Sequence, residues 1–190
     1  MRNLVYFVAC TVDGFIARAD GSFDCFLPDG EHFADLIRRF PETFPGHVRD
    51  ALGISGPNQH FDTVLMGRAT YAVGADHGFT NPYPTLEQYV VSHSMVASPD
   101  PAVTLVNDDP VALVRTLKHQ PGRDIWLCGG GQLAASLVAE IDQLILKVNP
   151  VRIGAGIPLF GTGFVPAGLA LTASSAYANG VLLLHYTVTR

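Results

Sequence analysis

The sequence is poor in the features that mark several common protein classes. Charged residues make up only 15% of its 190 residues, the formal net charge is -5, and there is no basic tail or stripe. Nucleic-acid and membrane-surface binding need clustered cations, so we expect neither partner. Cysteine is also scarce: three widely spaced cysteines form neither a disulfide framework nor a metal knuckle. We therefore predict no metal site.

Long apolar runs are missing as well, and none reaches the length of a membrane span. The N-terminal stretch 1–8 is apolar but short, and Asp13 and Gly14 interrupt it before any signal-peptide cleavage site. We therefore expect a cytoplasmic protein, which agrees with the unpaired cysteines. The length and the 48% hydrophobic content predict one domain, residues 1–190, with a substantial core.

The most informative stretch is residues 125–137, where an apolar run stops at three glycines and helical periodicity follows. Leu133, Leu137 and Ile141 are spaced four apart, which predicts one buried helix face. Glycine lets a bulky anion reach the backbone, and the first N–H groups of a helix lack intrahelical partners. The stretch therefore predicts a strand, a turn and a helix that bind phosphate. A tight turn that needs only backbone room is the alternative.

Two other apolar runs, 62–66 and 88–91, also end in groups suited to an anion. Arginine offers phosphate oxygens a planar fork of donors, and serine hydroxyls can face phosphate or ribose. A surface arginine with a local partner is the ordinary alternative for Arg68. The residues concerned are Gly67, Arg68, Thr70, Ser92 and Ser94.

A helix is predicted up to residue 40, because apolar side chains recur with helical spacing before Pro41. Asp29 is the predicted N-cap. Glu31 and Asp35 lie four apart beside the apolar stripe, where a carboxylate could reach a pocket and act as an acid. Simple solvation is the more ordinary role of such a residue.

Strand and helix patterns alternate along most of the chain. This alternation predicts an α/β fold with a mostly parallel central sheet and helices on both faces. The strong turn signal Asn179-Gly180 predicts that the chain ends in an antiparallel hairpin. The predicted strands are 4–11, 62–66, 88–91, 103–106, 125–128, 143–148, 169–175 and 181–188, and a further helix is expected at 110–119 with Asp109 as its N-cap.

A Rossmann dinucleotide site does not fit the sequence. That motif needs an acidic residue about 20 positions beyond the first glycine, at the end of the next strand. Here the next strand ends in Lys-Val-Asn-Pro at 147–150, and the glycines come late in the chain.

Four motifs in chain order resemble the dihydrofolate reductase superfamily. They span residues 8–17, 64–71, 90–94 and 126–131. Residues 149–161 read Asn-Pro-x-x-x-Gly-x-Gly-x-Pro-Leu-Phe-Gly, which is more particular. This pattern resembles the reductase domain of the bifunctional riboflavin-biosynthesis deaminase/reductase and its stand-alone bacterial relatives. The resemblance covers nearly the whole chain.

The resemblance implies a three-layer dihydrofolate reductase-like fold, with NADPH lying across the carboxyl ends of the strands. The glycine turn would hold the pyrophosphate, and the groups after the 62–66 and 88–91 runs would meet the adenosine phosphates, including the 2′-phosphate. Two residues near the first strand would flank the nicotinamide. In chain order the implied cofactor-binding residues are Ala9, Ile16, Gly67, Arg68, Thr70, Ser92, Ser94, Gly129, Gly130, Gly131, Gln132 and Leu133.

The implied activity is NADPH-dependent reduction of a small heteroaromatic or ribosylaminopyrimidine-type substrate. The zinc deaminase signature is missing, so only a reductase-type module is expected. Dihydrofolate reductases carry a carboxylate early in their first helix, and Asp29 and Glu31 are the two candidates here for a catalytic carboxylate. Relatives form homodimers, so we expect one. Dihydrofolate reductase itself, or a non-catalytic nucleotide-binding protein, are the alternatives.

Overall fold

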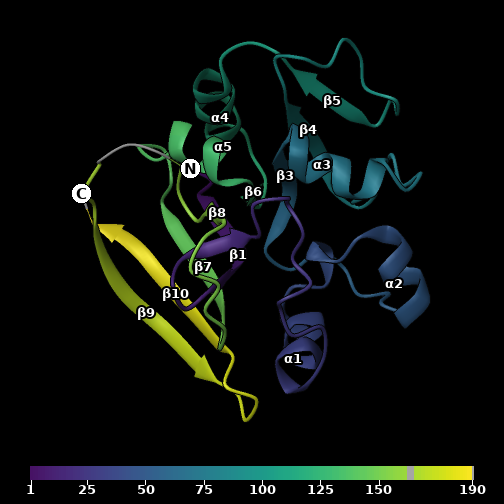
Figure 1. The fold of residues 1–190 in the computed structure, drawn as a ribbon. Coiled ribbons are helices and arrows are strands. Elements are labelled where there is room, and N and C mark those ends of the chain that lie inside the picture. The colour runs from purple at the N-terminus through teal and green to yellow at the C-terminus, as the bar shows by residue number, and fades with distance from the viewer. Residues whose placement is uncertain (162–164, 190) are drawn as a thin grey trace.

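A mostly parallel sheet forms the centre of the molecule (Figure 1). The structure is a computed structural model and describes residues 1–161 and 165–189. Within these residues, eight strands form one sheet in the order β5-β4-β3-β6-β1-β7-β10-β9. The six parallel strands are β1 (Leu4–Thr11), β3 (Phe61–Gly67), β4 (Glu87–Val91), β5 (Val103–Val106), β6 (Asp124–Gly129) and β7 (Gln143–Asn149).

The last two strands, β9 (Gly168–Ala176) and β10 (Leu182–Thr189), form the predicted antiparallel hairpin. The hairpin joins the sheet through β10, which pairs with β7, so β9 is an edge strand (Figure 1). The α/β class, the mostly parallel sheet and the terminal hairpin are all confirmed.

Helices cover both faces of the sheet because side chains alternate along the strands. Val5 and Phe7 of β1 pack in a cluster with residues of α1 (Glu31–Arg39) and α3 (Arg68–Ala75). Leu4 and Tyr6 face the other way, toward α4 (Pro110–His119) and α5 (Gly131–Ser136). The predicted three-layer arrangement is therefore confirmed. Asp109 caps α4 as expected, since its carboxylate accepts two backbone N–H bonds.

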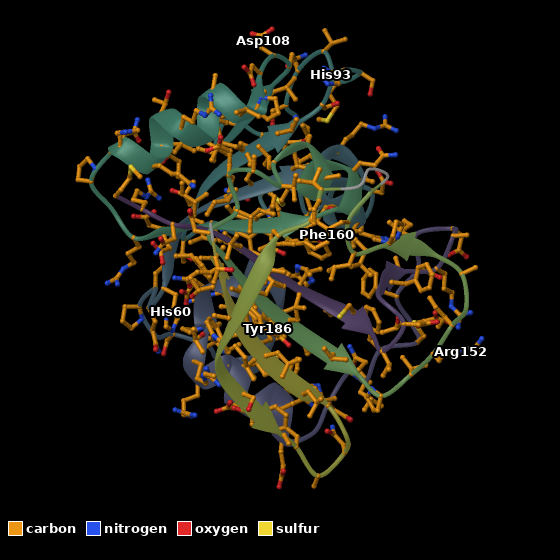
Figure 2. All side chains as sticks on the ribbon, turned by 90° about the vertical axis from the view of Figure 1, so that its left-hand side faces the viewer. His60, His93, Asp108, Arg152, Phe160 and Tyr186 are labelled. Atoms are coloured by element: carbon orange, nitrogen blue, oxygen red, sulfur yellow. The ribbon has the colours of Figure 1, made fainter. Side chains whose placement is uncertain are left out.

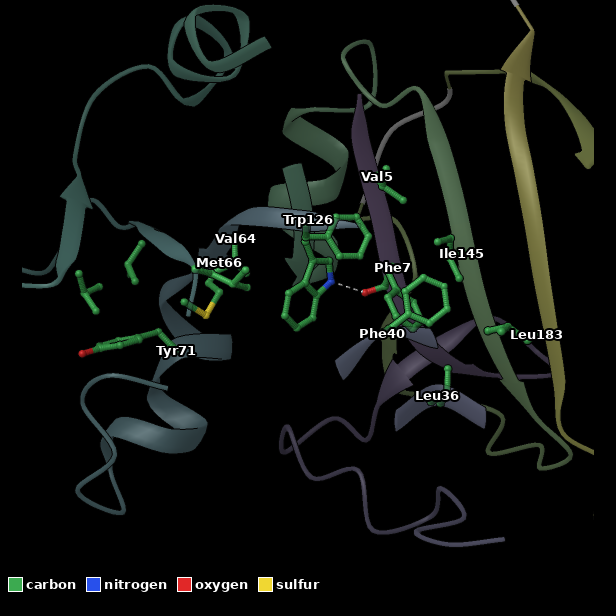
Figure 3. Packing of buried hydrophobic residues seen from close by; sticks show 14 residues of the cluster. Val5, Phe7, Leu36, Phe40, Val64, Met66, Tyr71, Trp126, Ile145 and Leu183 are labelled. Atoms are coloured by element: carbon green, nitrogen blue, oxygen red, sulfur yellow. Dashed lines mark hydrogen bonds between the residues drawn. The ribbon is translucent and has the colours of Figure 1, made fainter. Parts of the chain in front are cut away.

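The cluster under α1 and α3 is rich in aromatic rings, which Figure 3 shows around Trp126. The indole Nε1 donates a hydrogen bond of 2.9 Å to the backbone carbonyl of Phe7. This bond matters because a buried indole N–H without a partner is costly. Phe7 also packs on Phe40, with ring centroids 4.9 Å apart. The bond and the ring contacts join β6, β1 and the end of α1.

Two local predictions are wrong. Asp29 does not cap α1: the N-cap is Gly30, at a φ of 114°, and no side chain caps the helix. Gly30 lies against the hairpin turn, where a methyl group would be 2.8 Å from Asn179 Nδ2. The glycine helix is also shorter than the periodicity suggested. It ends at Ser136, so Ile141 is buried beyond the helix.

Residues 41–60 connect α1 to β3 through a short 3-10 helix (Pro41–Thr43) and α2 (Gly46–Leu52). Glu42, in the 3-10 helix, is fully buried. Its Oε1 accepts hydrogen bonds from the backbone N–H groups of His60 and Phe61, at 2.6 and 2.9 Å. The carboxylate therefore ties this connection to the start of β3. The helix α3, which follows β3 directly, was not predicted.

A second small sheet pairs β2 (Phe15–Ala17) with β8 (Ile157–Pro158). Two further bonds hold it in place: Leu159 N donates to the carbonyl of Gly14 at 2.8 Å, and Tyr6 Oη donates to the carbonyl of Leu159 at 2.7 Å. The glycine-rich segment at 152–161 is thereby packed on the loop that follows β1. No helix in the described part of the chain is long and apolar enough to cross a membrane.

Candidate functional site

The predicted anion-binding residues meet at the carboxyl edge of the parallel sheet. Gly67 of β3 pairs with Val91 of β4, and the residue before Gly67 pairs with Gly129 of β6. The residues that come next, Arg68 and Ser92, therefore lie along the same edge as the glycine turn. This is the edge at which open α/β sheets bind their ligands.

Backbone and small side chains form a cradle here, made of Ile16, Gly67, Thr70, Gly129 and Gly130. A methyl group at Gly67 would be 3.6 Å from both Gly129 O and Gly130 N. One at Gly130 would be 3.7 Å from Thr70 Oγ1 and 3.8 Å from Ile16 Cδ1. The peptide between the two glycines of the turn is cis. Three separate segments of the chain thus approach one spot, and the missing side chains leave it open.

Gly131 differs from the other two glycines of the turn. A methyl group there would overlap the carbonyl oxygen of Pro158, and its own carbonyl accepts a 2.8 Å bond from Gly161 N. Its missing side chain therefore serves packing against the 157–161 segment. Of the next two residues, Gln132 is exposed, whereas Leu133 belongs to the core on the α4/α5 face.

A cavity of about 450 Å³ lies beside the cradle, between α3 and the loop that follows β4. Arg68, Tyr71, Thr80 and Met95 line part of it, and the exposed Asp76 also borders it. Arg68 is exposed, and within the described chain no hydrogen bond or ion pair involves its guanidinium. A planar cation is therefore available to an anion in this cavity.

The two serines behave differently. Ser92 is buried, and its Oγ accepts bonds from the backbone N–H groups of Ser94 (3.3 Å) and Met95 (3.0 Å). It therefore shapes the loop beside the cavity, while Ser94 is exposed. His93 is also exposed, and its Nδ1 lies 3.0 Å from the carbonyl of Asn107.

The two candidate carboxylates, Asp29 and Glu31, are both exposed at the start of α1. The neighbouring His32 is fully buried, and its Nδ1 lies 2.9 Å from Asn179 Nδ2. Burial lowers the pKa of His32, and the positive charge of Lys147 lowers it further, while Asp29 opposes the change. The start of α1 is thus within electrostatic range of Lys147.

Lys147 was not predicted as a site residue. It lies in β7, in register with Ala9 of β1, a residue predicted to flank the nicotinamide. The available signal was a single charged residue within the apolar run 144–148. Burial lowers its pKa. Cys128, at the end of β6, is a neutral thiol, because burial raises its pKa to about 12.

Asp13 was also missed, because its position after a strand suggested only a turn. Its carboxylate accepts bonds from Thr11 Oγ1 at 2.6 Å, Gly154 N at 2.7 Å and Ile153 N at 3.2 Å. These bonds, chiefly the one from Thr11, lower the pKa of Asp13. The carboxylate therefore joins the end of β1 to the glycine-rich segment 152–161. In the described ranges no group of three or more His, Cys, Asp or Glu residues could hold a metal ion.

A family model and a curated relative both match nearly the whole chain. The family model of the RibD C-terminal domain matches residues 2–183. The Bacillus subtilis (strain 168) protein YwjB, described as uncharacterized, is 33% identical over 187 residues, which cover 97% of each chain.

Solved structures share the fold. A putative riboflavin biosynthesis protein from Shewanella sp. PV-4 has a TM-score of 0.72 at 22% identity, with both chains fully covered. A diaminohydroxyphosphoribosylaminopyrimidine deaminase/5-amino-6-(5-phosphoribosylamino)uracil reductase from Thermotoga maritima has a TM-score of 0.65 at 15% identity. That match covers 99% of this chain and 57% of the Thermotoga protein.

We expect Gly131→Ala to destabilise the protein by about 3 kcal/mol, because the new methyl group must displace the backbone at Pro158. Gly130→Ala is the matched control: its methyl group would make only ordinary contacts, so its loss of stability should stay within about 1 kcal/mol. Urea unfolding followed by circular dichroism measures both. Equal losses would show that the contact at Pro158 is not limiting.

Asp13→Asn should change how stability depends on pH. The pKa of Asp13 is lowered in the folded state, so its contribution is complete above the unfolded pKa of about 4 and is lost as pH falls through the lower folded value. The wild type should therefore melt at a higher temperature than the variant at pH 7, and the gap should narrow below about pH 4. Asp50→Asn, an exposed change on α2, controls for loss of one charge. A gap that is constant with pH would contradict the assignment.

Proposed function

We propose a reductase function from one premise: the chain belongs to the family of RibD C-terminal domains. The proposed activity is NADPH-dependent reduction of a small heteroaromatic or ribosylaminopyrimidine-type molecule. The observation that carries the proposal is the cradle of Ile16, Gly67, Thr70, Gly129 and Gly130, which opens beside a cavity with a free arginine.

The geometry of the edge fits a long, multiply charged cofactor. Gly129 and Gly130 have no side chains, so a pyrophosphate could reach their backbone. Thr70 Oγ1 lies beside both glycines and could donate a hydrogen bond to it. Arg68 would meet the adenosine-side phosphates in the adjoining cavity, with Ser94 exposed on the loop beside it. Ile16 and Ala9 would flank the nicotinamide. When bound, the reduced nicotinamide supplies a hydride, and the protein supplies orientation and exclusion of water.

The substrate class is proposed from the relatives. The Thermotoga protein is described as a reductase of 5-amino-6-(5-phosphoribosylamino)uracil, and the Shewanella protein as a riboflavin biosynthesis protein. These likenesses are low in sequence identity, so they support the substrate class through the fold and the family alone. A turnover assay with that pyrimidine and with dihydrofolate, each with NADPH, separates the two reductase assignments. Robust turnover of dihydrofolate would favour dihydrofolate reductase itself.

NADPH at about 100 times its Kd should raise the melting temperature of the wild type by about 5 °C or more. Arg68→Met should weaken NADPH binding by about tenfold or more, because it removes a charge-assisted contact to phosphate. Arg38→Met, on the exposed face of α1, is the matched control and should bind like the wild type. Calorimetric titration measures the Kd values. A wild type that NADPH fails to stabilise would leave only the non-catalytic assignment.

We also propose that the chain forms a homodimer through the α4/α5 face of the β9–β10 hairpin. Leu169 of β9 and Val188 of β10 border an apolar groove of about 330 Å³, together with Val138, Ile141 and Phe160. Leu171 of β9 is 55% exposed. Figure 2 views the molecule from the hairpin side, with Phe160 and Tyr186 labelled. β9 is a nine-residue edge strand with exposed apolar side chains. Such a strand tends to pair or associate with another protein surface unless something covers it.

Leu171→Lys should convert the dimer to a monomer, because it would bury a charge in the contact. Ala170→Lys is the control, since the neighbouring residue of β9 points to the opposite face of the hairpin. Light scattering coupled to size-exclusion chromatography gives the mass of each. A monomeric wild type, or equal dissociation of both variants, would refute this interface.

A further inference from the structure

Lys147 is a charged residue placed among apolar ones at the carboxyl end of β7. In the sheet register it lies between Ala9 of β1 and Leu183 of β10. Side chains alternate along a strand, so Lys147 shares a face with Ile145, which packs in the α1/α3 cluster. Leu183 is also a buried member of that cluster. An ammonium in such surroundings loses hydration, which is tolerated mainly where the charge has a partner or a function.

The second lysine of the chain shows what a structural role looks like. The chain has only two lysines, Lys118 and Lys147. Lys118 is buried, and its Nζ lies 2.6 Å from Asp142 Oδ2 and donates a 2.5 Å bond to the carbonyl of Glu140. Within the residues that the structure describes, no hydrogen bond or ion pair is found for Lys147 Nζ, and burial is the cause of its lowered pKa. The ammonium of Lys147 therefore has no structural partner among the described residues.

Among the described residues, none of the groups placed around Lys147 pairs with its ammonium. On α1, His32 lies within electrostatic range of Lys147, whose charge lowers the pKa of His32. The two carboxylates at the start of that helix, Asp29 and Glu31, are exposed, and neither pairs with the lysine. On the β1 side the neighbour is Ala9, whose methyl group cannot bind a cation. An electron-rich oxygen or nitrogen atom of a substrate is the partner that this position lacks.

We propose that Lys147 is a catalytic residue, whose ammonium binds the oxygen or nitrogen atom of the substrate's C=O or C=N group and then donates a proton to it. This inference rests on the proposed function, because it needs the nicotinamide beside Ala9. The hydride added to the substrate carbon, with its two electrons, would come from the bound reduced nicotinamide, which would be left oxidised. The N–H bond of Lys147 breaks, the new O–H or N–H bond forms, and the neutral amine regains a proton from water.

The first test needs no substrate. Reductive methylation with ¹³C-formaldehyde labels lysines and the α-amino group, so the spectrum holds at most three methyl signals. Lys147→Arg identifies the Lys147 signal by its loss. Saturating NADPH should shift that signal, because the proposed binding mode would bring the nicotinamide ring beside Lys147. The Lys118 signal, from a side chain held by Asp142, is the internal control and should stay in place.

The second test uses the pyrimidine and dihydrofolate as assay substrates. On the substrate that is turned over, Lys147→Met should lower kcat about 100-fold, in the range of a lost general acid. Lys147→Arg should have the KM of the wild type but the low kcat of Lys147→Met, because arginine keeps the charge and does not release its proton. Both variants should bind NADPH within twofold of the wild type. Arg152→Met, which removes an exposed cation at the periphery, is the control and should keep full activity (Figure 2).

The outcomes separate this inference from the function on which it rests. If NADPH neither stabilises the wild type nor shifts any methyl signal, the proposed function is lost. If NADPH stabilises the protein but the Lys147 signal does not move, Lys147 is not beside the cofactor and the inference is overturned. It is equally overturned if Lys147→Met retains the wild-type kcat.

Discussion

The close contact between Gly131 and the backbone of Pro158 is the constraint on which the rest of the site depends. It brings the start of α5 against β8, and β8 pairs with β2. Ile16, in β2, is thereby held across from Gly130. A second glycine repeats the principle, because a methyl group at Gly156 would overlap the carbonyl of Ala17. At both places two backbone segments are in direct contact. The position of the cradle therefore depends on the absence of side chains at Gly131 and Gly156.

Hydrogen bonds made by two side chains, the carboxylate of Asp13 and the buried amide of Asn149, complete this arrangement. Asp13 holds the 153–154 backbone from the loop after β1. Asn149, fully buried at the end of β7, donates to the carbonyl of Cys10 and accepts a bond from Leu27 N. The approach to α1, the end of β1 and the glycine-rich segment are therefore tied to one sheet edge. Such a supporting shell keeps a binding site at a fixed geometry.

The two faces of the sheet offer different surfaces. Toward α4 and α5, the apolar core extends to the groove under the β9–β10 hairpin, which suits a contact with another protein surface. Toward α1 and α3, the aromatic cluster is followed along β7 by Lys147, a cation without a structural partner. The separation follows from strand alternation, since Ile145 and Lys147 point to one face and Leu144 and Leu146 to the other.

The sequence by itself determined the fold class and the sheet edge at which the glycines, Arg68 and Ser92 gather, because periodicity and strand-end glycines are local signals. It predicted the hairpin and the Asp109 cap for the same reason. Only the tertiary structure decided that Gly130 has room for a ligand, whereas Gly131 packs against Pro158. It also decided that the N-cap of α1 is Gly30 and not Asp29, and that α5 ends at Ser136. It alone placed Lys147 beside Ala9 and Asp13 against Gly154. These contacts join residues more than a hundred positions apart, and no local pattern encodes such a pairing.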